Sequence, residues 1–275
     1  MRNQIIATTK PGGIGRQKMK ILRKVLLTAF VTVLINILFT TCLFAGSLVA
    51  YWSFDEDFED ILEDLSGTGN HGQINGKPEW VDGKFGKAME FDGVDDFVLV
   101  PNHESYNFTK DDSFSISLWI NYETKGDWSG PMQKFNGGYP FKVEVDTSNI
   151  LYFGVYDGTN FPRVNIGDVN GEWHHCVFMK DPDNLYAYLD GAPVAEAQNT
   201  ITAETANAAD LYIGARTPGN TITYIGMLDE IAIYNRLLTE DEIIQAANGK
   251  LPEVKLTVEY SDRFPTTWGH VKGDY

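Results

Sequence analysis

Acidic side chains gather at three places along the chain where a hard cation could bind. Asp55 follows the first apolar stretch, Asp92 lies in a glycine-containing turn at 91–96, and Asp229 lies within a late apolar stretch. Calcium takes about six to eight oxygen ligands from carboxylates, backbone carbonyls and water. The spacing matches no fixed cation-binding loop such as an EF-hand. The alternative is that Asp229 only accepts hydrogen bonds from neighbouring backbone amides.

A second group of residues has the chemistry of sugar binding. Trp128, Tyr139 and Phe161 lie in loops rich in glycine and proline, outside the alternating apolar pattern, and Asn136 lies near them. Sugars stack their apolar faces on aromatic rings, while amides and carboxylates bind the hydroxyl groups. These four residues are the predicted ligand-binding residues. The alternative is that the rings only cover the ends of the fold.

Evidence for catalysis is weak. Glycoside hydrolysis with retention requires two carboxyl groups that face each other across a sugar, about 5–5.5 Å apart. The sequence contains no nucleophile elbow, zinc-protease motif or phosphate-binding loop. His174 and His175 are adjacent, so on a strand they point to opposite faces and are poorly placed to share a metal. We expect one of them to be buried and hydrogen-bonded, and we predict no catalytic residue.

The elements expected to position these residues are short strands. Residues 114–120 place Phe, Ile, Leu and Ile on one face, and Asp190-Gly191 is a strong hairpin turn between two further strands. Helical periodicity occurs only at 239–248, where Thr239 and Glu242 form a capping box and Gly249 follows as the C′ residue. Short strands at such regular spacing predict an antiparallel all-β sandwich.

Three strings of residues carry a resemblance to a known family. They are Gly226-Met227-Leu228-Asp229-Glu230-Ile231-Ala232-Ile233-Tyr234-Asn235-Arg236-Leu237-Leu238-Thr239, Phe91-Asp92-Gly93-Val94-Asp95-Asp96 and Trp173-His174-His175. They resemble the laminin-G-like jelly-roll domains of the concanavalin A-like lectin/glucanase superfamily, over residues 48–249. The resemblance implies an all-β, antiparallel two-sheet jelly-roll sandwich with one short C-terminal helix.

The same resemblance bears on the candidate sites. It implies that a structural calcium ion ties the last strand to earlier segments through Asp229, with the segments around Asp55 and Asp92 supplying further ligands. Laminarinase-like members of the superfamily carry a Glu-x-Asp-x-Glu catalytic strand. Here the third acid is missing after Glu144 and Asp146. Because the fold serves binding modules, adhesins and hydrolases alike, it does not identify the ligand.

The N-terminus reads as a targeting segment. Residues 1–47 hold seven basic residues, no acidic residue and a long apolar run, as in a secretory signal peptide or an uncleaved membrane anchor. The rest of the chain then has 15 basic against all 38 acidic residues, a formal charge of −23. Such a charge argues against nucleic-acid binding. Residues 250–275 are predicted to form a C-terminal tail.

The sequence as a whole predicts an exported, non-catalytic binding module, located outside the cell or at its surface. The predicted partner is an extracellular or cell-surface glycan, with calcium as a structural ion. A surface adhesion or scaffold domain that binds protein, and a glycoside hydrolase, are the alternatives. Contact with a membrane is expected only through an uncleaved N-terminal segment.

Overall fold

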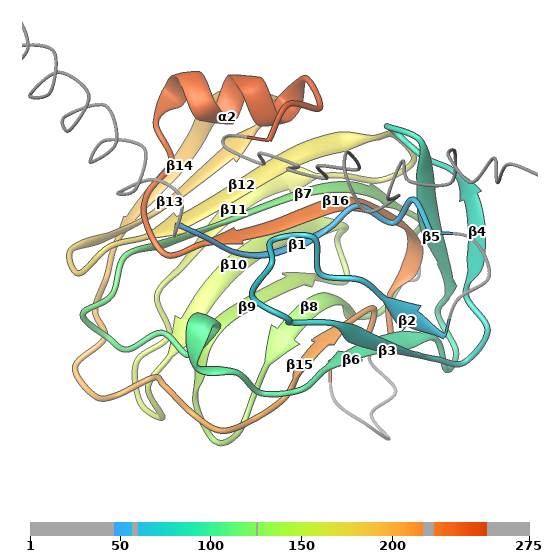
Figure 1. Cartoon of the computed structure of the whole chain (residues 1–275). Helices are drawn as coiled ribbons and strands as arrows, with labels where there is room; N and C mark the ends of the chain where they lie inside the picture. The colour runs from blue at the N-terminus through green and yellow to red at the C-terminus, as the bar shows by residue number, and fades with distance from the viewer. Residues whose placement is uncertain (1–46, 57–59, 125, 217–222, 252–275) are drawn as a thin grey trace, which may run out of the picture. The chain divides into compact units, whose positions relative to one another are not determined.

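The computed structural model describes residues 47–56, 60–124, 126–216 and 223–251, which are called the described residues below. They contain two antiparallel eight-stranded sheets packed face to face (Figure 1). The first sheet consists of β1 (Leu48–Trp52), β4 (Glu79–Asp82), β5 (Lys87–Asp92), β7 (Phe114–Tyr122), β12 (His174–Lys180), β13 (Asn184–Leu189), β14 (Ala192–Gln198) and β16 (Ile225–Tyr234). The second consists of β2 (Ile61–Leu62), β3 (Gly72–Asn75), β6 (Phe97–Val100), β8 (Ser129–Lys134), β9 (Tyr139–Val145), β10 (Ile150–Tyr156), β11 (Arg163–Asp168) and β15 (Leu211–Ile213). The predicted two-sheet jelly-roll sandwich is confirmed.

Strand order brings distant parts of the sequence together. The first sheet runs β14-β13-β12-β7-β16-β5-β4, with β1 also paired to β16. The second runs β11-β10-β9-β8-β15-β6-β3-β2. The late strands β15 and β16 therefore lie inside the sheets, between strands formed much earlier in the chain.

The core lies between the sheets because alternate residues of the central strands are apolar. Phe114 and Leu118 of β7 are fully buried, as is Val143 of β9. Aromatic rings join the two layers: Phe153 of β10 stacks on Phe178 of β12, with ring centroids 5.3 Å apart. Burial on this scale, without a disulfide among the described residues, is enough to hold a domain of this size.

The outer face of the first sheet is also covered. Helix α2 (Glu240–Ala247) lies over it (Figure 1) and buries Ile243 in a second apolar cluster with Val177 and Tyr234. The helix begins with the predicted capping box, in which Thr239 and Glu242 each accept a hydrogen bond from the other's backbone N–H. The predicted short C-terminal helix is confirmed.

The two adjacent histidines lie in different surroundings, as expected. His175 is buried, and its Nε2 lies 2.9 Å from Ser117 Oγ. The ring of His174 is partly exposed, and its Nδ1 lies 3.0 Å from Asp190 Oδ2. Asp190 itself has a positive φ of 51° in the β13–β14 turn, where the Asp-Gly pair predicted a hairpin.

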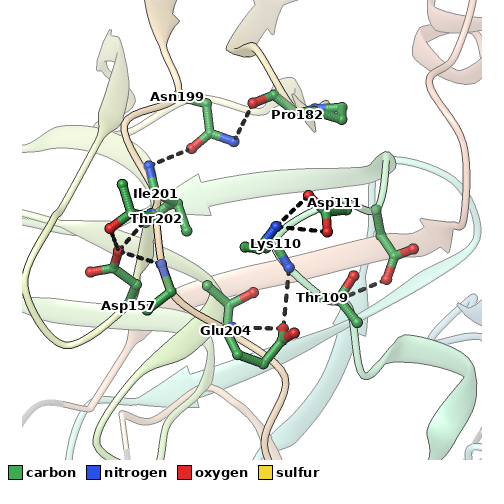
Figure 2. Close-up of polar contacts among 12 residues, drawn as sticks. Thr109, Lys110, Asp111, Asp157, Pro182, Asn199, Ile201, Thr202 and Glu204 are labelled. Carbon is green, nitrogen blue, oxygen red and sulfur yellow. Dashed lines mark hydrogen bonds and ion pairs between the residues drawn. The ribbon is translucent and has the colours of Figure 1, made fainter.

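Two carboxylates hold the segment that connects β14 in the first sheet to β15 in the second (Figure 2). Asp157 Oδ2 accepts hydrogen bonds from the backbone N–H groups of Thr202 (2.9 Å) and Ala203 (3.2 Å). Glu204 Oε1 accepts one from the backbone N–H of Lys110 (3.2 Å). A connection without regular structure is thereby tied to two other loops.

The predicted targeting segment and the C-terminal tail lie almost entirely outside the described residues. Within the described part of the chain, no helix combines the length and apolarity that crossing a bilayer requires.

Candidate functional site

Aromatic rings gather on the outer face of the second sheet, at the end formed by β8 to β11. Phe141, Val143 and Val145 of β9 face the core, so the alternating residues Lys142 and Glu144 face outward. Tyr152 occupies the same outer face of β10, since its neighbours Leu151 and Phe153 are core residues. Five rings meet here and form what we call the outer aromatic cluster: Trp128, Tyr139, Tyr152, Tyr156 and Phe161.

The rings of the outer aromatic cluster form a continuous row. Trp128 meets Tyr152 edge to face at 5.9 Å between centroids, and Tyr152 lies 6.3 Å from Phe161. Phe161 in turn meets Tyr139 edge to face at 5.7 Å. Edge-to-face contacts are a favoured arrangement of aromatic pairs. The row joins rings from separate parts of the chain, with Trp128 and Phe161 half-buried and Tyr139 and Tyr152 buried.

The four predicted ligand-binding residues differ in their placement. Trp128 directly precedes β8 and Phe161 lies between β10 and β11, and both are half-buried. Asn136 is exposed in the β8–β9 turn, where its backbone N–H donates to Gly138 (3.0 Å). The placement of Tyr139 in an exposed loop is wrong: it opens β9 and is only 5% exposed, because neighbouring rings enclose it.

A buried ion pair lies beneath the rings. Lys142 Nζ donates to Glu144 Oε2 at 2.7 Å, and the two side chains are 5% and 2% exposed. The hydroxyl of Tyr152 also donates to Glu144 Oε2. The ammonium of Lys142 lies 5.0 Å from the centre of the Phe161 ring. Burial lowers the pKa of Lys142, and the charge of Glu144 partly opposes that shift.

Two arginines and one amide complete this face. Arg163 is exposed, and its guanidinium lies 5.5 Å from the Tyr152 ring centre and 5.7 Å from that of Phe161. Arg216 Nε lies 3.6 Å from Glu144 Oε1. Gln133 of β8 pairs across the sheet with Lys142 and is 1% exposed. Neither atom of its amide has a hydrogen-bond partner among the described residues.

The loop that carries Phe161 is held by Asp157. Its Oδ1 accepts hydrogen bonds from the backbone N–H groups of Thr159 (2.9 Å) and Asn160 (2.6 Å), while its Oδ2 binds the β14–β15 connection (Figure 2). Desolvation raises the pKa of Asp157, but the hydrogen bonds from Asn160, Thr202 and Thr159 together outweigh it and hold the pKa well below its ordinary value. The anchored loop keeps Phe161 against the other rings.

Sequence reasoning missed several members of this site, namely Gln133, Lys142, Tyr152, Tyr156, Arg163 and Arg216. A signal existed for two of them, because Lys142 and Tyr152 alternate with core residues and so had to face outward. The pattern could not show that this outer face is covered by rings from other segments of the chain.

A second candidate site lies at an irregularity in β16. The register of β16 against β7 shifts between Asp229 and Ala232, and Glu230 has a positive φ of 52°. At the same point the strand changes its other neighbour, from β5 at Leu228 to β1 at Ile231. Such bulges redirect side chains. Here the bulge carries two carboxylates in succession.

The turn between β4 and β5 receives the carboxylates of both Asp229 and Asp55. Asp229 Oδ2 accepts hydrogen bonds from the backbone N–H groups of Lys84 (2.9 Å) and Phe85 (3.0 Å), and Asp55 Oδ1 accepts one from Lys87 (2.9 Å). A Cβ at Gly86 would lie 2.0 Å from Asp55 Oδ1, and φ there is +64°. Glycine is therefore required for this close approach.

The electrostatics of this carboxylate site, formed by Asp55, Asp229 and Glu230, are unfavourable for three negative charges. Burial, followed by the charges of Glu230 and Asp55, raises the pKa of Asp229 to about 7. Burial and the charge of Asp55 raise the pKa of Glu230 to about 7. The second oxygen of Asp229, Oδ1, is buried and has no hydrogen-bond partner among the described residues. Carboxylate oxygens are the ligands that a hard cation prefers, but among the described residues the one group of three carboxylates with oxygens within 4.8 Å of one another is Asp92, Asp95 and Asp96.

Asp92 is not brought to the carboxylate site. It ends β5 opposite Ile225 of β16 and forms a cluster with Asp95 and Asp96, whose oxygens lie within 4.8 Å of one another. The cluster has a structural role, because Asp96 accepts hydrogen bonds from the backbone N–H groups of Lys77 (2.7 Å) and Asp92 (3.1 Å). Of the three predicted metal ligands, Asp55 and Asp229 share one turn and Asp92 lies apart.

Comparison with known proteins assigns the chain to a family. The family model of the concanavalin A-like lectin/glucanases superfamily designated Laminin_G_3 matches residues 92–244, more than half of the chain. The chain therefore belongs to this superfamily. No curated protein matches it by sequence.

Solved structures with the same fold include toxin binding domains. The binding domain of Paraclostridial Mosquitocidal Protein 1 has a TM-score of 0.63 at 18% identity, covering 75% of this chain and 53% of that chain. The binding domain of botulinum neurotoxin DC in complex with SialylT has a TM-score of 0.61 at 15% identity, with 75% and 52% covered. The receptor binding domain of the botulinum neurotoxin C/D mosaic serotype has a TM-score of 0.63 at 11% identity, with 74% and 52% covered. This chain thus spans about half the length of each, and at these identities the likeness concerns the fold.

Proposed function

We propose that this chain is an exported, non-catalytic carbohydrate-binding module, and that sugar binds on the outer aromatic cluster. The observation that carries the proposal is the row of rings from Trp128 through Phe161 with hydrogen-bonding and charged groups beside it. Rings of this kind stack on the apolar faces of sugars, and adjacent polar groups bind the hydroxyls. The similar solved structures support the proposal, since they are named as binding domains and one is a complex with SialylT.

The carboxylates of the same face support binding rather than hydrolysis. Glu144 is engaged by Lys142 and Tyr152 and is 2% exposed in its side chain. Asp146 Oδ1 accepts hydrogen bonds from the backbone N–H groups of Ser148 (2.8 Å) and Ile150 (3.1 Å). Hydrolysis needs one carboxyl group free to protonate the leaving oxygen and a second facing the sugar. Glu144 is instead buried in its ion pair and Asp146 is bound within its own turn, an arrangement that favours binding.

A glycan array probed with the exported chain tests the proposal. Phe161→Ala and Trp128→Ala should each weaken binding to the retained glycans by about 1–3 kcal/mol, because large rings dominate the affinity of interfaces. Ile244→Ala is the matched control, since Ile244 is an exposed apolar residue of α2, 49% accessible and remote from the rings in sequence. If the array retains no glycan, the proposal fails. Release of new reducing ends from a bound glycan would establish hydrolysis instead.

Protein adhesion is the second candidate function. A binding domain of botulinum neurotoxin DC with this fold was solved in complex with rat synaptotagmin II. Binding of a surface protein that is unaffected by Phe161→Ala and Trp128→Ala, without glycan binding, would favour this alternative.

Calcium is proposed as a structural ion held by Asp229 and Asp55. In that position it would tie the bulge of β16 to the β4–β5 turn and to the segment after β1, and its charge would offset the three carboxylates of the carboxylate site. A ligand that binds only the folded state stabilises it by mass action. Chelation should therefore lower the melting temperature by several degrees.

Asp229→Asn should abolish this calcium dependence, and Asp92→Asn should leave it unchanged. The two variants remove the same charge at different places, which makes the second a matched control. If neither EDTA nor added calcium changes the melting temperature of the wild type, the calcium proposal is contradicted. Loss of the dependence in Asp92→Asn alone would place the ion at the Asp92 cluster.

Export to the cell surface or the medium completes the proposed function. Its support is the basic and apolar character of residues 1–47, which lie outside the described residues except for Ser47. Cell fractionation and N-terminal sequencing of the mature chain test it. A chain retained in the cytoplasm would contradict it.

A further inference from the structure

Positive charge is concentrated at the outer aromatic cluster of a strongly acidic protein. The whole chain has a formal charge of −16. Yet the charged side chains acting most strongly on the Lys142 ammonium are Glu144, Arg216 and Arg163, and the same three side chains also act on the Tyr139 hydroxyl. Three cations and one carboxylate therefore share this face. Because electrostatic interactions weaken with distance and are screened by salt, this local excess matters more to a small ligand than the distant acids do.

Arg163 is the cation that is free to bind a ligand. Its guanidinium lies over the Tyr152 and Phe161 rings at 5.5 and 5.7 Å, and its side chain is exposed. Among the described residues its side chain forms no ion pair and donates no hydrogen bond. The rings hold the planar group in place without using its donors. A guanidinium presented in this way fits the two oxygens of a carboxylate or a sulfate.

Two polar side chains of this face, Glu144 and Gln133, have unused hydrogen-bonding capacity. Arg216 Nε is 3.6 Å from Glu144 Oε1, too far for a hydrogen bond, and that oxygen has no other partner among the described residues. The amide of Gln133, 1% exposed, also lacks partners for both its oxygen and its nitrogen there. A buried polar group without a partner is costly. The Gln133 amide, which can donate as well as accept, thus points independently to a polar group or a water at this face, whereas the free Glu144 oxygen can only accept a hydrogen bond.

We infer that the glycan bound by this module is acidic, and that Arg163 together with Arg216 binds its carboxylate or sulfate while Phe161 and Trp128 stack on the sugar rings. The inference rests on the proposed function. A neutral sugar would need only the rings and neutral hydrogen-bonding groups. The overall negative charge of the chain disfavours long polyanions, so the fitting ligand is a glycan with an isolated acidic sugar.

Paired glycans that differ only in the acidic group test the inference. The probes are a sialylated oligosaccharide and its asialo form, a glucuronate-terminated oligosaccharide and its glucose-terminated form, and a sulfated galactoside and its unsulfated form. The exported chain should bind the acidic member of at least one pair at least 10-fold more tightly, and added NaCl should weaken that binding. The pair that responds identifies carboxylate or sulfate as the recognised group.

Arg163→Gln should lower the affinity for the acidic member by about 10- to 100-fold, as loss of a hydrogen bond to a charged group does, and should leave the neutral member within about twofold. Lys77→Gln is the matched control, because it changes the net charge equally at an exposed residue of the β3–β4 connection. Equal affinity for both members of every pair, or an equal loss in Lys77→Gln, overturns the inference while glycan binding stands. Failure of every glycan to bind overturns the proposed function as well.

Discussion

Acid should destabilise the fold through one buried imidazole, that of His175. The side chain is 1% exposed, its Nε2 lies 2.9 Å from Ser117 Oγ, and its Nδ1 has no hydrogen-bond partner among the described residues. Burial lowers the pKa of His175 from 6.5 to about 4, and the charge of Asp190 only partly offsets this effect. The ring is therefore neutral in the folded protein over most of the accessible pH range.

The coupling between protonation of His175 and folding gives the size and sign of the change in the free energy of unfolding. A shift from 6.5 to about 4, at about 1.4 kcal/mol for each pH unit, corresponds to about 3 kcal/mol. Because the pKa is lower in the folded state, the unfolded chain takes up the proton first as the pH falls. With respect to His175, the free energy of unfolding has its full value above pH 6.5 and decreases progressively between pH 6.5 and 4.

Urea unfolding at pH 7.5 and 4.5 measures this contribution. His175→Gln can keep a hydrogen bond to Ser117 but cannot titrate, so the wild type should lose about 2–3 kcal/mol more than this variant between the two pH values. Carboxylates titrate in both proteins and cancel in the comparison. His103→Gln is the control, since His103 is exposed, and it should follow the wild type. A difference between wild type and His175→Gln that stays constant with pH would refute the reasoning.

Three further outcomes are expected. Tyr139→Ala should cost about 3 kcal/mol or more in urea unfolding, because it empties a site that is 5% exposed, whereas Trp128→Ala at the half-buried rim should cost much less; equal losses would contradict the burial of Tyr139. Asp157→Ala should lower the melting temperature at neutral pH, and by clearly less at pH 2. The lowered pKa means that the carboxylate stabilises the fold fully above its ordinary pKa of 3.8 and loses this effect progressively as the pH falls below that value, so a difference as large at pH 2 as at neutral pH would contradict it. Thr239→Ala should cost about 1 kcal/mol, since it removes the capping box of α2, and an unchanged urea midpoint would show that the cap contributes nothing.

Local pattern accounts for most of the fold that could be predicted. The alternation of residues 114–120 identified β7 and its core face, Asp190-Gly191 identified the β13–β14 turn, and Thr239 with Glu242 identified the start of α2. Each of these signals lies within a few residues, because side-chain direction, turn conformation and helix capping depend on neighbouring positions. The strands and the sandwich class were therefore within reach of the sequence.

Which residues meet at each candidate site is decided by the order of the strands in the two sheets. Asp55 and Asp229 meet at the β4–β5 turn because β16 changes its partner from β5 to β1 at a bulge, while Asp92 stays with its own turn. The burial of Tyr139, and the ion pair of Lys142 and Glu144 beneath the rings, arise because β8 to β11 bring rings from separate segments onto one face. Period-two alternation tells which residues face outward, but only pairing between distant strands decides what covers them.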